Sequence, residues 1–295
     1  MAIDVLKINS YAKINIGLQI LGKREDGFHE IETIFQEIDL HDTITLTKQR
    51  AEVAVHCNHP FVPHGPLNLA HKAAILLRKT FSITEGVCVS IDKNIPVGAG
   101  LGGGSSNAAV VLKGLNQLWN LALNRSELKT LAAKIGSDVP FFIDGGTALA
   151  HGRGEILRRI ESFPAFTCLV IYPNIQISTK WSFKNYNLYL TNTKKSVKLS
   201  ESFFKDIKLR QFRGLFINAL EDVAFNKYPV LRELKKKLYF SGAEYASMSG
   251  SGSAIYGLFD SNSMLHKARR ELNQSYQIFV TIPIRRRLDN NHRDK

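Results

Sequence analysis

The sequence predicts an α+β protein with two domains, and three observations support this prediction. Polar and apolar residues alternate near the N-terminus as in a strand, helical periodicity follows in the middle of the chain, and strand and helix signals do not alternate strictly. The length of 295 residues fits one large domain or two of ordinary size. A chain of this length buries enough surface to fold without disulfides or a structural metal.

The clearest strand signal lies in residues 6–20. Apolar side chains occupy the even positions 6, 8, 12, 14, 16, 18 and 20, and polar side chains, including Lys13 and Asn15, occupy most of the odd ones. Period-two alternation indicates one buried face and one face in polar surroundings. We therefore expect Lys13 and Asn15 to point in the same direction, away from the core. Further strands are predicted at 43–47 and 87–91.

Helical periodicity is predicted over residues 68–78 and again from Ser105 onward, where apolar residues recur every three or four positions. Residues 126–135 are predicted to form a third helix. We expect Ser126 to be its N-cap and Gly136 to end it.

A domain boundary is predicted near residue 160, after a glycine-broken segment. We divide the chain into an N-terminal domain (1–160), a C-terminal domain (161–284) and a basic tail (285–295). The C-terminal domain is predicted to contain three strands and three helices, in the order strand, helix, helix, strand, helix, strand, over residues 166–172, 212–224, 229–239, 254–259, 262–273 and 276–284.

Charge and cysteine content exclude several classes of protein. The formal net charge of +13 favours phosphorylated partners, but no nucleic-acid-binding motif accompanies it, so we expect no nucleic acid as partner. The three cysteines are widely spaced without a CxxC pair, which is typical of the reducing cytoplasm. The longest apolar stretch, 165–172, is too short to cross a bilayer, and the N-terminus lacks a signal-peptide pattern. We expect a cytoplasmic monomer or weak homodimer without membrane contact.

The strongest functional signal is a glycine-rich segment that runs directly into a helix. Glycine backbones adopt positive φ easily and can expose N–H groups to an anion, while the following helix N-terminus adds unpaired N–H donors. We therefore predict a triphosphate site over Pro96, Val97, Gly98, Ala99, Gly100, Leu101, Gly102, Gly103, Gly104, Ser105 and Ser106. The two serines could cap the helix, bind a phosphate oxygen or help to hold Mg²⁺. The segment is neither a Walker A motif nor a dinucleotide fingerprint, because no Lys-Ser/Thr pair ends it and its glycines are too dense.

Two other segments carry candidate chemistry. Asp138 lies between a helix end and an apolar run, where capping a turn is the simpler role when the residue is taken alone. A catalytic role needs a partner, and Lys13 is the candidate, because an ammonium group keeps a neighbouring carboxylate ionised and can stabilise a hydroxyl as it loses its proton. Residues 247–254 form a second glycine-rich loop, so we expect a cleft closed from two sides by backbone donors.

These three segments, in this order, resemble the motifs of the GHMP kinase superfamily. The resemblance covers about residues 6 to 259 and narrows to the family of 4-diphosphocytidyl-2-C-methyl-D-erythritol kinases, on the segments Ala12-Lys13-Ile14-Asn15, Asp26-Gly27-Phe28-His29, Leu101–Ala109 and Gly136–Pro140. It implies a two-domain fold with the active site between the domains. The N-terminal domain would have a ribosomal-protein-like β/α arrangement, and the C-terminal domain a ferredoxin-like sheet.

The resemblance also implies roles for individual residues. The phosphates of ATP would lie along residues 96–106, and Asp138 would take the proton from the 2-hydroxyl of the substrate while Lys13 polarises it. Mg²⁺ would accompany ATP, although the sequence identifies no protein ligand for the metal. The cytidine end of the substrate would be bound by Phe28, His29, Phe183, Asn15 and Thr179.

The sequence departs from the family pattern at three places. Ala99 stands where another glycine is frequent, which requires a negative φ at this position. Phe28 replaces a frequent tyrosine, so it loses a hydroxyl and keeps the ring face. The basic stretch from 285 has no counterpart, and we expect it to be a mobile tail.

Two alternatives stay open. One is another GHMP kinase, acting on homoserine, mevalonate or a sugar. The other is a non-catalytic ligand-binding protein on the same fold, which would keep its function when Asp138 is replaced by asparagine.

Overall fold

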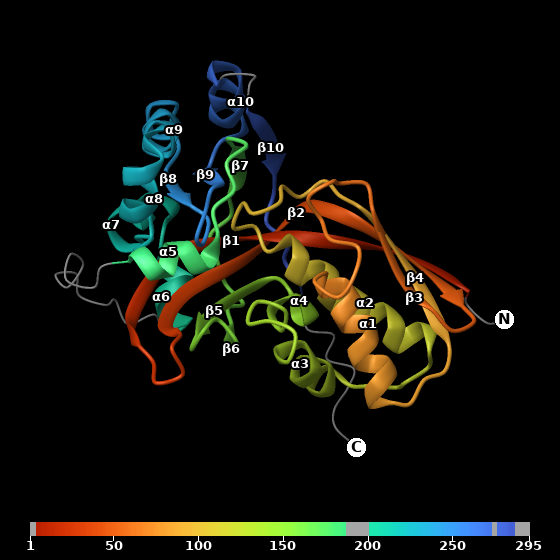
Figure 1. Cartoon of the computed structure of the whole chain (residues 1–295). Helices are drawn as coiled ribbons and strands as arrows, with labels where there is room; N and C mark the ends of the chain where they lie inside the picture. Colours follow the sequence, from red (N-terminus) through yellow and green to blue (C-terminus); the bar gives the residue numbers. More distant parts are fainter. Residues whose placement is uncertain (1–3, 187–200, 273–275, 287–295) are drawn as a thin grey trace.

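The computed structural model describes residues 4–186, 201–272 and 276–286. The N-terminal half contains a sheet with helices on one side (Figure 1). Its elements are β1 (Val5–Lys23), β2 (His29–Gln49), β3 (Val53–Cys57), α1 (Leu69–Thr80), β4 (Gly86–Asp92), α2 (Gly103–Leu118), α3 (Arg125–Ala133), α4 (Phe141–Asp144), β5 (Thr147–His151) and β6 (Ile156–Arg159).

The C-terminal half contains a second sheet with its own helices (Figure 1). Its elements are β7 (Thr167–Tyr172), α5 (Thr179–Asn185), α6 (Glu201–Asp206), a 3₁₀ turn (Leu209–Gln211), α7 (Phe212–Leu215), α8 (Glu221–Lys227), α9 (Pro229–Phe240), β8 (Tyr245–Met248), β9 (Ile255–Phe259), α10 (Asn262–Glu271) and β10 (Gln277–Thr281).

The strand pairing confirms the predicted α+β class. Within the described residues, one sheet has six strands in the order β3-β4-β2-β5-β6 with β1 paired to β2, and the other has four in the order β10-β7-β9-β8. All pairs are antiparallel except β3 with β4. Along the chain, the strands of the second sheet follow as β7, β8, β9 and β10, with helices after β7 and after β9. This is the ferredoxin-like arrangement that the resemblance implies.

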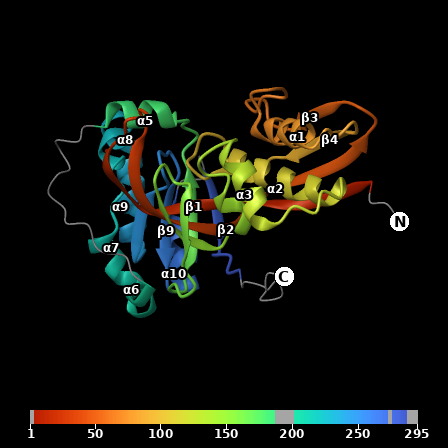
Figure 2. The same ribbon diagram turned by 90° about the horizontal axis from the view of Figure 1, so that it is seen from below.

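The antiparallel pair β1–β2 connects the two halves of the molecule. Figure 2 shows both strands running from the side that carries α5 and α8 to the side that carries α1 and α3. One end of β2 pairs with β4 and the other with β5, while Leu18 of β1 bridges to Asn218 of the C-terminal half. The middle of β1 therefore lies at the junction between the halves.

This junction corrects one sequence-based expectation about β1. Lys13 and Asn15 point in the same direction as predicted, because the ammonium of Lys13 donates a hydrogen bond to the amide oxygen of Asn15. They do not face away from the core: their exposed fractions are only 4% and 2%. The second face of the strand is covered, since the backbone N–H of Lys13 donates to Leu101 O and that of Asn15 to Ser249 Oγ.

Two helix starts also differ from the prediction. The side chain of Asn124, and not Ser126, caps α3, because Glu127 completes a reciprocal capping box with Asn124. This helix ends at Ala133, before the predicted stop. Helix α2 begins at Gly103, inside the glycine-rich segment, because its N-cap Gly102 has a φ of +71°.

The chain returns to the N-terminal half after β10. Strand β10 ends at Thr281, three residues earlier than predicted. Beyond it, the N–H of Ile284 donates to Glu37 O of β2. Arg286 donates two hydrogen bonds of 2.7 Å to the carboxylate of Glu37. The first residues of the predicted tail therefore belong to the folded structure, and residues 287–295 lie outside the described part of the chain.

Among the helices of the described residues, none is both long enough and apolar enough to cross a membrane.

Candidate active site

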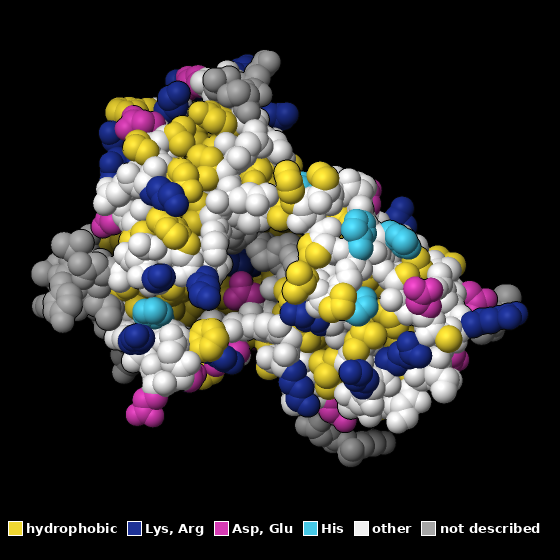
Figure 3. Space-filling view, viewed as in Figure 1, with side chains coloured by type: hydrophobic (Ala, Val, Ile, Leu, Met, Phe, Trp, Pro, Cys, Tyr) yellow, Lys and Arg dark blue, Asp and Glu magenta, His cyan; other side chains and the backbone are white. Residues whose placement is uncertain are grey.

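A cleft of about 1170 Å³ lies between the two halves. Figure 3 shows the hollow, with Lys and Arg side chains on its wall and hydrophobic side chains near its edges. The middle of β1, the glycine-rich segment, the turn that carries Asp138, helix α5 and residues 250–251 all contribute to its lining. All the candidate site residues from the sequence line this cleft except Ser106.

Lys13 and Asp138 face each other in the cleft. The ammonium of Lys13 lies 3.5 Å from Oδ2 of Asp138 and donates to the backbone oxygen of Gly100 at 3.1 Å. Asp138 stands in a tight turn that the N–H of Val139 closes on Gly136 O, and the fully buried Val139 side chain anchors this turn. The carboxylate keeps an exposed fraction of 34%, so it reaches the open space of the cleft.

Burial lowers the pKa of Lys13 below its ordinary value, and the charge of Asp138 opposes that effect. Asn15 is held beside this lysine, because its Nδ2 donates to Thr33 Oγ1 at 3.1 Å while its Oδ1 accepts from Lys13. A lysine fixed on three sides and paired with a partly exposed carboxylate can polarise a hydroxyl group that enters the cleft.

The glycine-rich segment is held in place through hydrogen bonds to its carbonyl groups, which leaves its N–H groups exposed. Gly98, Gly100 and Gly102 have φ values of +69°, +79° and +71°, a region that favours glycine. The backbone oxygens of the segment accept hydrogen bonds from β1 and from the C-terminal half, including Ile177 N to Gly98 O and Ala254 N to Ala99 O. Within the described part of the chain, the N–H groups of residues 98–105 donate to no protein acceptor. They are therefore available to bind an anion at the start of α2.

Two details of this segment bear on the sequence predictions. Ala99 does not have a positive φ, which meets the condition for replacing a glycine at this position. Ser105 lines the cleft, whereas Ser106 is buried and its Oγ accepts a hydrogen bond of 2.8 Å from Ser10. The two serines diverge because neighbouring residues on a helix point about 100° apart.

Aromatic side chains also line the cleft. The rings of His29 and Phe183 are stacked, with centroids 5.2 Å apart, and the Arg153 guanidinium lies 4.9 Å from the centre of the Phe28 ring. Phe28 keeps an exposed fraction of 52%. Burial, and then the charge of Lys23, lower the pKa of His29, which favours the neutral ring. Thr179, at the start of α5, exchanges a hydrogen bond of 2.9 Å with Ser251.

The cleft also contains residues that no sequence motif predicts. Phe61 and Leu67, with exposed fractions of 72% and 78%, form an apolar edge beside the glycine-rich segment. Several cationic side chains complete the lining: Lys23, Lys93, Arg153, Lys180 and Lys184. No local pattern marks these residues, because they are spread along the chain from β1 to α5. Their only trace in the sequence is the excess of positive charge.

The charges of the cleft suit two polyanionic ligands. Among the described residues that line it, six are lysine or arginine, and Asp138 is the single carboxylate. We find no cluster of three His, Cys, Asp or Glu side chains suited to a metal among the residues that the structure covers. Among the oxygen donors that line the cleft, the Ser105 hydroxyl at the start of α2 fits Mg²⁺, which commonly takes one or two protein oxygens and completes its shell with phosphates and water.

Comparisons with known proteins agree with this geometry. The profile of the GHMP kinases N terminal domain matches residues 68–146, and that of the GHMP kinases C terminal domain matches residues 200–278. The 4-diphosphocytidyl-2-C-methyl-D-erythritol kinase of Acetivibrio thermocellus is 38% identical over 94% of this chain and 99% of its own length. The enzyme of the same name from Alkaliphilus oremlandii is 42% identical over 92% of this chain and 93% of its own.

Solved structures give the same result. A crystal structure of 4-(cytidine 5'-diphospho)-2C-methyl-D-erythritol kinase superposes with a TM-score of 0.78 at 31% identity, over 94% of this chain and 99% of the other. The homoserine kinase of Cytophaga hutchinsonii, 17% identical over 96% of both chains, shares the fold with a TM-score of 0.76. The chain therefore belongs to the 4-diphosphocytidyl-2-C-methyl-D-erythritol kinase family of the GHMP kinases.

Proposed function

We propose that this protein transfers the γ-phosphoryl group of ATP to the 2-hydroxyl of 4-diphosphocytidyl-2-C-methyl-D-erythritol, giving the 2-phosphate and ADP in the non-mevalonate route to isoprenoid precursors. The observation that carries the proposal is the position of the Lys13–Asp138 pair in a cleft lined by the N–H-rich segment 98–105 and by the aromatic group Phe28, His29 and Phe183. A phosphate donor and a cytidine-containing acceptor would meet at this pair.

The two ligands fit different parts of the cleft. The triphosphate of ATP suits the anion site at the start of α2, and its adenine suits the apolar edge formed by Phe61 and Leu67. A cytosine ring suits the stacked pair His29–Phe183, because aromatic faces bind a base by stacking. The diphosphate of the acceptor would be neutralised by the lysines of α5, Lys180 and Lys184.

Catalysis by this chain would rest on alignment and charge. Phosphoryl transfer needs the attacking hydroxyl, the phosphorus and the leaving oxygen in line, with the developing negative charge neutralised. Asp138 would accept the proton of the 2-hydroxyl as the O–P bond forms, while Lys13 stabilises the oxygen. Asn15 and Thr33 would keep Lys13 in place.

We include Mg²⁺ in the proposal. Ser105 is the protein group that would hold it, and the metal would supply neutralisation of phosphate charge. We also propose a cytoplasmic location and a monomeric or weakly dimeric state.

The test is an assay that couples ADP release to NADH oxidation, run with 4-diphosphocytidyl-2-C-methyl-D-erythritol and, in parallel, with homoserine and mevalonate. We expect turnover with the first compound alone. Turnover with homoserine or mevalonate instead would contradict the proposed substrate. Absence of turnover with all three, together with saturable ligand binding, would favour a non-catalytic binding protein.

A further inference from the structure

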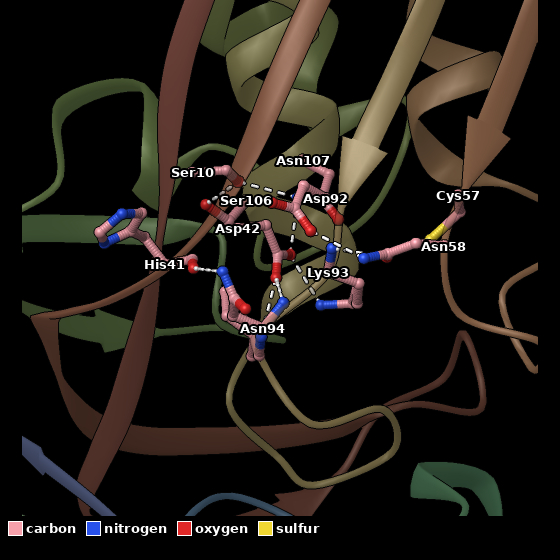
Figure 4. A network of polar contacts seen from close by, with 11 residues as sticks. Ser10, His41, Asp42, Cys57, Asn58, Asp92, Lys93, Asn94, Ser106 and Asn107 are labelled. Carbon is pink, nitrogen blue, oxygen red and sulfur yellow. Dashed lines mark hydrogen bonds and ion pairs between the residues drawn. The ribbon is translucent and has the colours of Figure 1, made fainter.

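A buried carboxylate outside the catalytic pair joins the two ends of the glycine-rich segment (Figure 4). Asp42 of β2 has an exposed fraction of 0%. Its Oδ1 accepts the backbone N–H groups of Asn94 and Ile95, each at 2.8 Å, and these residues directly precede Pro96. Its Oδ2 accepts from Asn107 Nδ2 at 2.9 Å, and Asn107 directly follows Ser106.

The fourth partner of Asp42 faces the cleft. Lys93 Nζ donates to Oδ2 of Asp42 at 2.7 Å. The same ammonium lies against Gly103, the first residue of α2, because a β-carbon built on Gly103 would lie only 2.9 Å from Lys93 Nζ. Four hydrogen bonds fill the acceptor capacity of a carboxylate. The group is fully satisfied, so its position is fixed by every one of these contacts.

Further contacts extend the link to β1. Ser10 donates to Ser106 Oγ at 2.8 Å and accepts from Asn107 Nδ2 at 3.0 Å. Figure 4 shows Ser10, Asp42, Lys93, Asn94, Ser106 and Asn107 converging from β1, β2, the segment before the glycines and α2. The strand that carries Lys13 and the segment that would carry the phosphates are therefore tied at one point.

We propose that Asp42 is a positioning residue for nucleotide binding, which holds both ends of residues 96–106 at a fixed separation so that their N–H groups are ordered before ATP arrives. This inference rests on the proposed function, because it assigns the phosphates to that segment. A run so rich in glycine loses more backbone entropy on ordering than other sequences. Ordering it in the free protein removes that loss from the free energy of binding.

Asp42→Asn is the sharpest test, because it preserves shape. Either orientation of the new amide places its NH₂ group against a pair of donors, so one end of the segment is released. We expect the KM for ATP to rise by roughly 10- to 100-fold, the effect typical of a lost positioning contact. The KM for the alcohol substrate should stay within about twofold of the wild-type value. Amide hydrogen exchange should become faster in residues 98–105.

Asp92→Asn is the matched control. Asp92 belongs to the same network, where it accepts from Asn58 Nδ2 at 2.7 Å, but it contacts neither end of the glycine-rich segment. The KM of the Asp92→Asn variant for ATP should stay within about twofold of the wild-type value. If Asp42→Asn does not fold, Asn107→Ala, which releases only the α2 end, should raise the KM for ATP in the same direction.

The outcomes separate this inference from the proposed function. A purely structural role would lower kcat in proportion to the loss of folded protein and leave both KM values unchanged, which would overturn the inference. An unchanged KM for ATP in the folded variant tested would overturn it as well. Failure of the wild-type protein itself to bind ATP, measured by calorimetric titration, would overturn the proposed function first and the inference with it.

Discussion

Replacement of Gly100 by alanine tests the close contact between the glycine-rich segment and the C-terminal half. Gly100 has a φ of +79°, and a β-carbon built on it would lie 2.0 Å from Ser249 O and 3.1 Å from Gly252 N. The first distance is about 1.4 Å short of ordinary van der Waals contact. The obstructing atom is a backbone oxygen, so no side-chain rotation relieves the overlap.

The expected cost has two parts. The left-handed backbone conformation costs an alanine about 1–2 kcal/mol, and overpacking of a close contact costs about 1–3 kcal/mol. Together they predict a loss of roughly 2–5 kcal/mol in the free energy of unfolding, which corresponds to a fall in Tm of roughly 3–8 °C for a chain of this size. Gly100 O also accepts from Lys13 Nζ and Ser249 Oγ, so a shift of this backbone should lower kcat as well.

Gly104→Ala is the matched control for stability. Its φ lies outside the positive region, and the nearest atom to an added β-carbon is Leu69 Cδ1 at 3.7 Å. Alanine at this helical position should stabilise the protein by up to about 1 kcal/mol. Both variants would be compared with the wild-type protein by urea denaturation and by calorimetry. Equal stability of Gly100→Ala and the wild type, or equal destabilisation of the two variants, would refute the reasoning.

Three other perturbations follow from the structure. Arg286→Ala leaves the carboxylate of Glu37, which is 2% exposed, without its cation, so the free energy of unfolding measured by urea denaturation should fall by about 3 kcal/mol. Adding Glu37→Gln to this variant should restore part of the lost stability. A loss within experimental error in Arg286→Ala would contradict the role of this ion pair. Burial, reinforced by the charge of Arg286, lowers the pKa of Lys113 from 10.5 to about 8, so the unfolded chain binds more protons between these values and wild-type stability rises with pH in that window. The stability advantage of Lys113→Met over the wild type should therefore shrink by about 3 kcal/mol from pH 8 to 10.5, and a constant difference would argue against this shift. Phe183→Ala should raise the KM for the cytidyl substrate by about tenfold or more and leave the KM for ATP unchanged, whereas Phe61→Ala should raise the KM for ATP and leave that for the cytidyl substrate unchanged. Parallel effects on both KM values would contradict the separate binding regions.

Local signals in the sequence predict part of the site. The density of glycine before an amphipathic helix marks the segment whose N–H groups have no protein acceptor among the described residues, and the alternation in β1 correctly gives Lys13 and Asn15 a common face. The burial of that face could not be predicted, because it depends on loops that reach it from Leu101 and Ser249, far along the chain. The pairing of Lys13 with Asp138 likewise depends on the tertiary fold, and in the sequence only the family resemblance indicates it.

Asp42 shows why other residues were missed. It lies in a long strand close to His41 and Asp39 but in no recognised motif, and it acquires significance only when β2, α2 and the segment before Pro96 come together. The capping error at α3 has a local cause: asparagine and serine are both good N-caps, and the glutamate three residues after Asn124 decides between them. Similarly, the end of β10 is set by pairing with β7 and by the crossing of residues 282–286 to β2, which no local pattern reveals.

The most direct test of the central claim is the kcat of Asp138→Asn, measured at saturating ATP and 4-diphosphocytidyl-2-C-methyl-D-erythritol, with the Kd for ATP determined on the same preparation. If Asp138 accepts the proton of the attacking hydroxyl beside Lys13, kcat should fall by about 10²- to 10⁴-fold while the Kd for ATP changes little. A kcat close to that of the wild type would show that the carboxylate is not part of the reaction, and the assignment of this pair as the catalytic centre would be wrong.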